Sequence, residues 1–227
     1  MSVFVVTGHR RGLGHGITGA LERRGHPVVG VSSAEADLAD PDALATDAER
    51  ILTSVDWGDA QLVGLVANAG ILEPIGPLDR IRPDAMIRHV TVNLAAPLVW
   101  VGAFLRATTG VGDRRIALVS SGAARTAYSG WGPYCATKAG LDQLARVLAA
   151  EGHRNLRVEA VAPGVIDTDM QAAIRACDPA DFPEQPRFVA RAEAGELPAA
   201  DEVGERFVDH LLSPAFGRDV VTDLRQL

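Results

Sequence analysis

The sequence predicts an α/β fold in which a mostly parallel sheet carries helices on both faces. Short apolar runs rich in β-branched residues alternate along the chain with longer segments of helical periodicity. The apolar runs are continuous rather than alternating with polar residues, which is typical of strands buried on both faces. The 227 residues contain no repeat, low-complexity segment or obvious linker, so we expect one domain over residues 1–227.

The first half of the chain supplies three strands and two helices. Strands are expected at 3–7, 28–31 and 62–67, with helices between them at 12–24 and 40–54. The second helix has a start signal, since Asp40 is a preferred N-cap residue and Pro41 suits the first helical position. Asp37 and Leu38 follow the second strand almost at once, so the usual helix between strands two and three should be shortened.

The second half continues the alternation around one long irregular segment. Helices are expected at 83–107, 134–150 and 201–212, and strands at 116–120, 156–162 and about 220–221. Residues 168–198 contain Pro179, Pro183 and Pro186 and only short helical patterns. This segment follows the C-terminal end of a strand, where open α/β sheets bind ligands, so we interpret it as a substrate-binding lid. The alternative is a plain surface excursion.

Composition excludes several functional classes. The chain is 47% hydrophobic and 22% charged with a net charge of −7, as in ordinary globular proteins, and no basic run argues for nucleic acid. The longest apolar stretch, 94–105, contains Pro97 and is too short to cross a bilayer, and no secretory signal is visible. Cys135 and Cys177 lack metal or disulfide spacing, and the histidines lack metal-ligand spacing. We expect a cytoplasmic protein without a metal, a membrane or a nucleic-acid partner.

A glycine cluster joins the first strand to the first helix. Gly8, Gly12 and Gly14 would let the chain turn sharply and bring its backbone close to a pyrophosphate at the helix N-terminus. This position predicts a dinucleotide site in a doubly wound sheet of the Rossmann type. Gly14, Gly16 and Gly19 also satisfy a G-x-G-x-x-G string, but that match lies inside the predicted helix and is treated as coincidental.

The residues near the second strand indicate which dinucleotide is bound. An acid at the end of that strand would bind a ribose diol, whereas basic residues would accept a 2′-phosphate. The strand ends in Ser32 and Ser33, and Arg10 and Arg11 bring positive charge to the glycine loop. These residues favour NADP(H), while Glu35, the nearest acid, favours NAD.

Tyr134 and Lys138 form the most informative pair in the chain. Lys138 is the sole lysine among 22 Lys and Arg residues, and Tyr134 is one of two tyrosines. Positions four apart share a helix face, so the ammonium would lie beside the phenol and lower its pKa. A lysine is a compact charge suited to this task, although a match of this spacing also arises by chance.

Five ordered motifs make the whole chain resemble the short-chain dehydrogenase/reductase family. They are Thr7–Gly14, Asn68-Ala69-Gly70, Asn93, Ser121 thirteen residues before Tyr134, and Pro163–Thr168. Ala67 stands where the family often has a second asparagine before Asn68. The resemblance implies the catalytic set Asn93, Ser121, Tyr134 and Lys138. It implies cofactor contacts from Gly8, Arg10, Arg11, Gly12, Leu13, Gly14, Ser32, Asp37, Leu38, Asn68, Ala69, Gly70, Tyr134, Lys138, Pro163, Gly164, Val165 and Thr168.

A closer resemblance is to sepiapterin reductases and bacterial benzil reductases. It rests on Ser121–Ala124, Gly130-Trp131, Tyr134-Cys135, Lys138–Asp142 and the segment from Pro163 to Gln171. The resemblance implies NADPH-dependent reduction of vicinal dicarbonyl compounds, and the family implies a homodimer. Trp131, Met170 and Gln171 are expected to line the substrate pocket, although Trp131 could equally belong to the core. Asp223 lies about where sepiapterin reductases place a pterin-anchoring acid, or it is an ordinary turn residue.

The expected chemistry is proton-coupled reduction of a carbonyl. Hydride from the nicotinamide would attack the carbonyl carbon, and Tyr134 would deliver a proton to the oxygen as general acid. Ser121 would hydrogen-bond that oxygen, and Lys138 would hold the nicotinamide ribose and lower the pKa of Tyr134. Ser121 could instead cap the next turn, and Ser120 could take its part.

Asn93 lies four residues before Pro97, which has no backbone N–H. The Asn93 carbonyl would therefore lose its helical partner, and the helix should kink. A freed carbonyl near Lys138 could hold a water and extend a proton relay, or Pro97 could simply bend the helix. The sequence as a whole predicts an NADPH-dependent carbonyl reductase. The alternatives are an NAD-dependent alcohol dehydrogenase, a non-catalytic NADP(H)-sensing regulatory protein, and an epimerase or dehydratase on the same fold.

Overall fold

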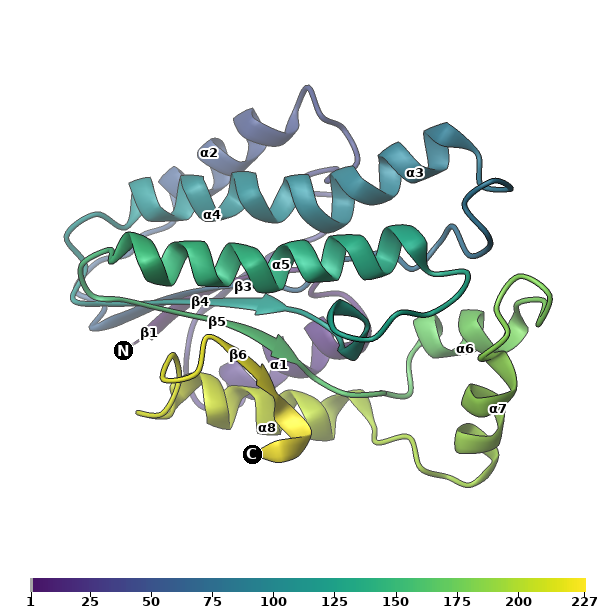
Figure 1. Ribbon diagram of the computed structural model, residues 1–227. Helices are drawn as coiled ribbons and strands as arrows, with labels where there is room; N and C mark the ends of the chain where they lie inside the picture. Colours follow the sequence, from purple (N-terminus) through teal and green to yellow (C-terminus); the bar gives the residue numbers. More distant parts are fainter. Residues whose placement is uncertain (1) are drawn as a thin grey trace.

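A parallel six-stranded sheet forms the centre of the protein in a computed structural model that describes residues 2–227 (Figure 1). The strand order is β2-β1-β3-β4-β5-β6, and each neighbouring pair is parallel. The strands are β1 Ser2–Thr7, β2 Val28–Val31, β3 Leu62–Ala67, β4 Asp113–Val119, β5 Leu156–Ala162 and β6 Val221–Asp223. The order reverses between β1 and β3, and the loops that follow these two strands therefore meet at a crevice for a ligand.

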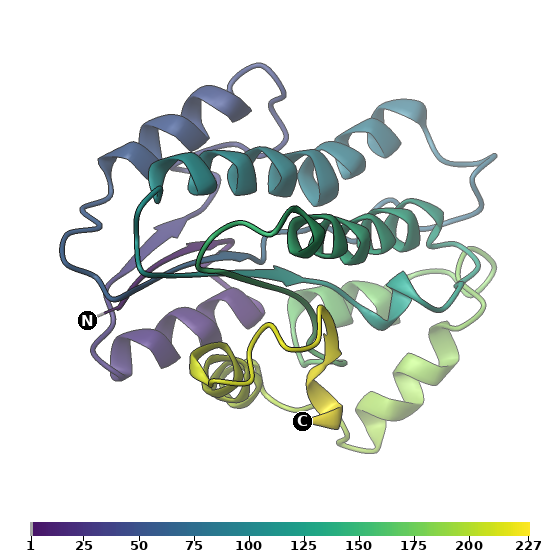
Figure 2. The ribbon, with the colours of Figure 1, turned by 60° about the vertical axis from the view of Figure 1, so that its left-hand side comes forward.

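Helices cover both faces of this sheet, which confirms the predicted fold class (Figures 1 and 2). The helices are α1 Gly12–Arg23, α2 Leu44–Ser54, α3 Pro83–Val90, α4 Ala96–Ala107, α5 Gly132–Glu151, α6 Asp169–Ala176, α7 Gln185–Glu193 and α8 Ala200–Leu212. Helices α2, α4 and α5 lie on one face, and α1 and α8 lie on the other. Each face buries its own apolar cluster, with Trp100 and Phe104 in the first and Ile17 and Phe207 in the second.

The connection between β2 and α2 is built from turns. The helix expected from Asp40 begins only at Leu44, because Asp40 instead closes a turn in which its side chain accepts the Asp42 N–H at 2.9 Å. The Leu44 N–H then donates to the Asp40 carbonyl at 3.1 Å. Residues 32–43, all of them described by the structure, contain turns and no helix, and the helix between β2 and β3 is α2, which has 11 residues and starts four residues later than expected.

The predicted helix 83–107 is continuous but not uniform. Between α3 and α4 lies a π-helical turn, Thr91–Ala95, in which the Ala96 N–H donates to the Thr91 carbonyl. The whole stretch Pro83–Ala107 is 25 residues long, and an 18-residue window has a mean hydropathy of 1.5. By length and composition this helix could cross a membrane, whereas the apolar run 94–105 identified in the sequence is too short to do so. Because α4 buries Trp100 and Phe104 against the sheet, we interpret it as a core helix.

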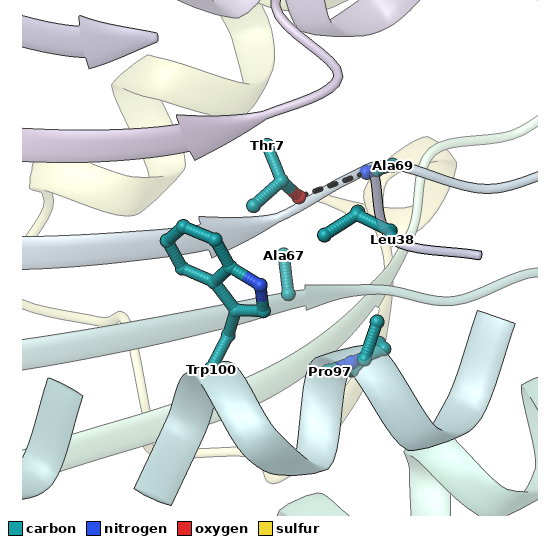
Figure 3. Close-up of a pocket in the computed structure, with 7 residues that line it drawn as sticks. Thr7, Leu38, Ala67, Ala69, Pro97 and Trp100 are labelled. Carbon is teal, nitrogen blue, oxygen red and sulfur yellow. Dashed lines mark hydrogen bonds between the residues drawn. The ribbon is translucent and has the colours of Figure 1, made fainter. Parts of the chain in front are cut away.

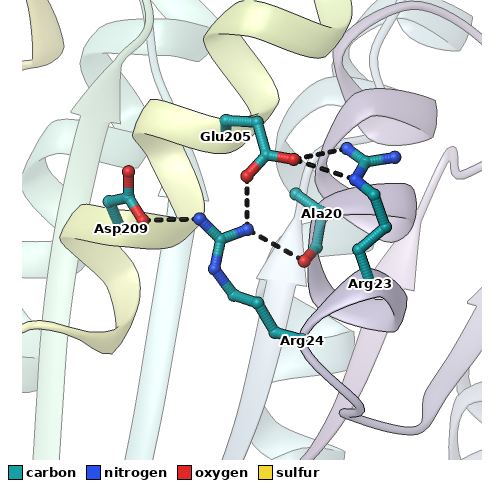
Figure 4. A network of polar contacts seen from close by, with 5 residues as sticks. All are labelled: Ala20, Arg23, Arg24, Glu205 and Asp209. Carbon is teal, nitrogen blue, oxygen red and sulfur yellow. Dashed lines mark hydrogen bonds and ion pairs between the residues drawn. The ribbon is translucent and has the colours of Figure 1, made fainter.

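Helices α1 and α8 pack unusually closely. A Cβ atom added at Gly16 would lie 2.3 Å from the Ala200 carbonyl oxygen, so only glycine permits this approach. Glu205 and Asp209 of α8 pair with Arg23 and Arg24 at the end of α1, and Glu205 accepts the Arg23 Nε–H at 2.9 Å (Figure 4). Gly16 therefore serves helix packing, in agreement with the interpretation of the second glycine string as coincidental.

Candidate functional site

The glycine loop has the shape that close approach of an anion requires. Gly8 and Gly12 have φ values of 71° and 53°, a left-handed conformation that favours glycine. A Cβ atom at Gly14 would lie 2.1 Å from the Gly8 carbonyl oxygen. Glycine at these positions therefore lets the loop pack closely on the start of α1, whose first N–H groups have no partner within the helix, as in a pyrophosphate site.

The Asn68 motif holds this loop in place. The Thr7 hydroxyl oxygen accepts the N–H groups of Asn68 at 3.1 Å and Ala69 at 3.0 Å. The Asn68 side chain donates to the carbonyls of Thr7 at 3.0 Å and Gly8 at 3.3 Å. A small cavity of about 10 Å³ lies beside these bonds, and Leu38, Ala67, Pro97 and Trp100 line it (Figure 3). The structure thus brings Leu38, an expected cofactor residue, next to the glycine loop.

Ser32 and Glu35 are bonded to each other at the end of β2. The Glu35 carboxylate accepts the Ser32 N–H at 2.8 Å and the Ser32 hydroxyl at 2.5 Å. These hydrogen bonds lower the pKa of Glu35, with a smaller contribution from the charge of Arg10. Arg10 and Arg11 are both exposed, and Arg11 lies 3.4 Å from Asp169, the first residue of α6. Asp37 is exposed, and its side chain accepts the Ala39 N–H at 3.0 Å.

Ser121, Tyr134 and Lys138 meet at the C-terminal end of β4. Ser121 follows this strand and caps the short helix Gly122–Ala124, and its hydroxyl is hydrogen-bonded with Tyr134. Tyr134 and Lys138 lie on successive turns of α5, with the Lys138 Nζ 5.6 Å from the Tyr134 ring centroid. Lys138 donates to the Val119 carbonyl at 2.7 Å and is only 5% exposed. The predicted trio is therefore assembled in one buried place.

Burial is the largest influence on the pKa values of Lys138 and Tyr134. It lowers the pKa of Lys138 from 10.5 to about 8, against the opposing effect of the nearby Asp142 carboxylate. Burial also raises the pKa of Tyr134, against the opposing effect of its hydrogen bond with Ser121. The Tyr134 pKa is therefore raised overall and not lowered as expected, because desolvation of the phenolate outweighs the effects that favour it. Tyr134 is a neutral phenol at neutral pH and can donate a proton.

Asp142 resolves the choice between the two serines. The Ser120 hydroxyl donates to the Asp142 carboxylate at 2.5 Å, whereas Ser121 is the serine hydrogen-bonded with Tyr134. Asp142 lies one helical turn after Lys138, is 2% exposed, and faces Arg125 at 3.4 Å. The sequence analysis counted Asp142 in a family motif but gave it no role, although its position four residues after Lys138 could have indicated one.

Asn93 lies within the π-helical turn, behind Lys138. Its side-chain oxygen accepts the Ile71 N–H at 2.8 Å, and its Nδ2 donates to the Ile71 carbonyl at 2.7 Å. The helix departs from α-helical geometry just before Pro97, and the expected kink stays a prediction. A water on the Asn93 carbonyl stays a prediction.

The Pro163–Thr168 segment reaches the glycine loop from the other side. Gly164 has a φ of 90°, and the Arg225 side chain packs against it. A Cβ atom at Gly12 would lie 3.3 Å from the Thr168 side chain, so the first and last motifs meet. A cavity of about 210 Å³ lies beside this segment, lined by Pro163, Gly164, Val165, Arg191, Glu196, Pro198, Val203, Arg206 and Arg225.

An aromatic cluster closes over Tyr134. Trp131 lies 5.4 Å from the Tyr134 ring and stacks on Phe182, with centroids 4.4 Å apart and planes 9° apart. Phe188 of α7 packs on both Trp131 and Phe182. Phe182 and Phe188 come from the segment 168–198, whose lack of periodicity hid them from sequence reasoning. Trp131 is therefore both buried and next to Tyr134.

The three other residues expected to contact the substrate, Met170, Gln171 and Asp223, each have a different environment. Gln171 is buried on α6, and its side-chain oxygen lies 3.5 Å from Arg175, while Met170 packs at the edge of the aromatic cluster. Asp223 is bound by Arg225, whose N–H and Nε donate to it at 3.0 and 2.9 Å. This pairing lowers the pKa of Asp223 and gives its carboxylate the role of capping the last turn, Leu224–Gln226.

Similar sequences are known in other organisms. The sequence profile described as short chain dehydrogenase matches residues 31–178. A benzil reductase ((S)-benzoin forming) of Bacillus cereus is 31% identical over 90% of this chain and 92% of its own length. A sepiapterin reductase of Xenopus laevis is 30% identical over 88% of this chain and 77% of its own length.

Solved structures extend the likeness to the fold. A short-chain dehydrogenase/reductase of Burkholderia vietnamiensis is 35% identical, with a TM-score of 0.65 over 100% of this chain and 99% of that one. A provisionally assigned NAD(P)-dependent gluconate 5-dehydrogenase of Beutenbergia cavernae, with NADP bound at low occupancy, is 27% identical. Its TM-score is 0.81 over 98% of this chain and 94% of that one.

Proposed function

The chain belongs to the short-chain dehydrogenase family of oxidoreductases, which act on CH–OH and C=O groups with a nicotinamide cofactor, and from this premise we propose that it is an NADPH-dependent carbonyl reductase. The observation that carries the proposal is the buried trio Ser121, Tyr134 and Lys138, in which the phenol is neutral. A neutral phenol donates a proton, which is what reduction of a carbonyl requires.

The residues of the chain divide the work of the reaction. A dinucleotide held at its pyrophosphate by the glycine loop would supply a hydride to the carbonyl carbon. Tyr134 donates a proton to the carbonyl oxygen, and the Ser121 hydroxyl hydrogen-bonds the same oxygen as its charge develops. The Lys138 ammonium would stabilise the phenolate that remains on Tyr134 and would hold the nicotinamide ribose.

The proposed substrates are aromatic vicinal dicarbonyl compounds. Trp131 lies beside Tyr134 and is backed by the fully buried Phe182, so the wall next to the phenol is apolar and suits an aryl group. The relatives named as benzil and sepiapterin reductases support this class. The segment 168–198, which supplies Phe182 and Phe188, is proposed as the lid of a single-domain enzyme.

The test is NADPH oxidation with benzil, run beside NADH. Turnover that is faster with NADPH would support both the activity and the cofactor. Faster turnover with NAD and an alcohol would favour the alcohol dehydrogenase, and tight NADPH binding with no turnover of any carbonyl would favour a sensing protein. The complete trio argues against a sensor, since binding alone needs no proton donor.

The choice of nucleotide should depend on Arg10 and Glu35. Glu35 occupies the Ser32 donors that a 2′-phosphate would use, and Arg10 lies close enough to lower the Glu35 pKa. We expect Arg10→Ala to weaken NADPH binding by roughly tenfold and Glu35→Ala to strengthen it, each with little effect on NADH. Fluorescence titration of both nucleotides measures this, and equal shifts for NADPH and NADH would contradict it.

The lid proposal predicts a selective effect on aromatic substrates. Phe182→Ala removes the fully buried ring that backs Trp131, so the Trp131 wall should loosen and the KM for benzil should rise by up to about tenfold. The KM for butane-2,3-dione, which has no ring, should change by less than about twofold. Steady-state kinetics with both diketones provide the comparison, and equal increases would indicate a general disturbance of the lid.

We also propose a homodimer, located in the cytoplasm and acting on small molecules without a nucleic-acid or membrane partner. Apolar side chains are exposed on α3, α4 and α5, namely Ile87 at 67%, Leu98 at 47% and Val147 at 43%. Helices α4 and α5 lie side by side on one face (Figure 1). Such a patch is typical of a surface that a second copy covers.

Charge placed in this patch should separate the subunits. We expect Leu98→Glu or Val147→Glu to convert a dimer to a monomer in size-exclusion chromatography with light scattering, because a buried unpaired carboxylate is costly. Leu227→Glu is the matched control, since Leu227 is 65% exposed but lies at the C-terminus. A dimer that survives both changes on α4 and α5 would rule out this surface.

A further inference from the structure

A buried histidine supports the wall behind Tyr134 and Lys138. His89, at the end of α3, is 0% exposed. Its Nδ1 lies 2.9 Å from the Glu73 carbonyl oxygen, and its Nε2 lies 2.9 Å from the Asn93 Nδ2. The Thr137 hydroxyl on α5 is 3.3 Å from the same Nε2. The imidazole therefore bridges the loop after β3, the π-helical turn and α5.

The neighbours of His89 allow one protonation state. The Asn93 side chain is bonded to the Ile71 backbone, which donates to its oxygen and accepts from its Nδ2. The second Nδ2 hydrogen points toward His89, so the Nε2 must accept it, and the Nδ1 must carry the proton donated to the Glu73 carbonyl. The Thr137 hydroxyl has its own acceptors, the carbonyls of Pro133 at 2.9 Å and Tyr134 at 3.1 Å.

His89 and Asn93 lie close to both Lys138 and Tyr134. Ile71 directly follows Gly70, where an added Cβ atom would lie 3.4 Å from the Asn93 Oδ1 and 3.8 Å from the Lys138 Nζ. The His89 ring also meets the Tyr134 ring edge-on, with centroids 6.1 Å apart. Movement of His89 would release the backbone against which Lys138 lies.

We propose that His89 is a positioning residue, whose neutral imidazole orients Asn93 and thereby fixes the loop Gly70–Glu73 against the Tyr134–Lys138 pair. His89 acts through Asn93 and does not itself touch the substrate or the cofactor. Its catalytic consequence rests on the reductase activity proposed above.

Protonation of His89 at low pH should break its hydrogen bond with Asn93. A second proton on His89 would place an N–H of Nε2 against the Asn93 N–H, two donors facing each other. The charged or titratable groups around the ring are Lys138 and Tyr134 on α5, while Glu73 offers its carbonyl and has an exposed side chain. Burial and the Lys138 charge lower the pKa of His89, so the neutral form should persist through neutral pH.

Two substitutions separate the two contacts of His89. In His89→Gln the side-chain oxygen can still accept from Asn93, whereas His89→Asn keeps only a donor for the Glu73 carbonyl. With NADPH and benzil, we expect the Gln variant to retain kcat within about threefold, and the Asn variant to lose about tenfold in kcat with an unchanged KM. In the parent protein, kcat should fall at low pH as His89 is protonated. This fall should be absent in the Gln variant, which has no imidazole.

A second readout does not depend on turnover. Lys138 is the only lysine, so protein labelled with ¹³C-lysine gives one signal that reports its titration. We expect a pKa of about 8 in the parent protein and the Gln variant, and a value closer to 10.5 in the Asn variant, where water can enter. A parent protein that does not reduce benzil would overturn the proposed function, while the lysine titration would still test His89.

Two results would overturn the role of His89. One is a parental kcat and a parental Lys138 titration in both variants. The other is a loss of kcat in both variants that follows only their loss of thermal stability, with the acid limb and the Lys138 titration unchanged.

Discussion

Replacing Tyr134 with phenylalanine is expected to lower kcat for carbonyl reduction by ~10²–10⁴-fold, the range that a positioned general acid contributes. The variant keeps the ring that packs between Trp131 and His89 and loses only the hydroxyl bonded with Ser121. Binding of NADPH and thermal stability should therefore change little. Steady-state kinetics with benzil and a fluorescence titration of NADPH measure the two effects separately.

Tyr128→Phe is the matched control for this experiment. Tyr128 is the other tyrosine of the chain, and its ring lies 5.1 Å from Trp131 in the same cluster. The Tyr128 variant should keep kcat within about threefold because its hydroxyl has no part in the reaction. Comparable losses in the two variants would show that the cluster, and not the Tyr134 proton, limits turnover.

Replacing Lys138 with methionine is expected to lower kcat by ~10²–10³-fold, as loss of a preorganised donor does in other enzymes. Methionine fills a similar volume in the buried site but removes the charge that stabilises a phenolate on Tyr134. Affinity for NADPH should fall as well, if Lys138 holds the ribose. A variant with parental kcat would mean that the positive charge is supplied elsewhere.

Lys138 also predicts how stability depends on pH. Its pKa falls from 10.5 in the unfolded chain to about 8 in the folded protein, so between these values the unfolded chain binds more protons. The free energy of unfolding should therefore rise with pH from about 8 to 10.5, whereas the cost of burying the charge is fully present below pH 8.

The Lys138→Met variant lacks this titration. The difference in the free energy of unfolding between the parent and the variant should shift by about 3 kcal/mol in favour of the parent between pH 7 and pH 10.5. Urea denaturation at several pH values measures the difference, and other groups cancel because both proteins contain them. Parallel pH profiles would mean that Lys138 titrates normally in the fold.

The strands were predictable because their signals are local. Continuous apolar runs located β2 and β3 to the residue, and Pro97 marked the place where the long helix leaves α-geometry. The start of α2 was not predictable from Asp40 and Pro41, since a turn uses the same residues as a helix cap. Both structures satisfy the same N–H groups, so the local sequence does not choose between them.

The candidate site shows the same division. The sequence by itself determined the glycine loop and the order of Ser121, Tyr134 and Lys138, because sharp turns need glycine and helical spacing puts Tyr134 and Lys138 on one face. Only the tertiary structure decided the direction of the Tyr134 pKa, the choice of Ser121 over Ser120, and the places of His89 and Phe182. Each of these depends on burial or on contact between residues far apart in the chain. Desolvation and packing are properties of the assembled fold and leave no periodic signal in the sequence.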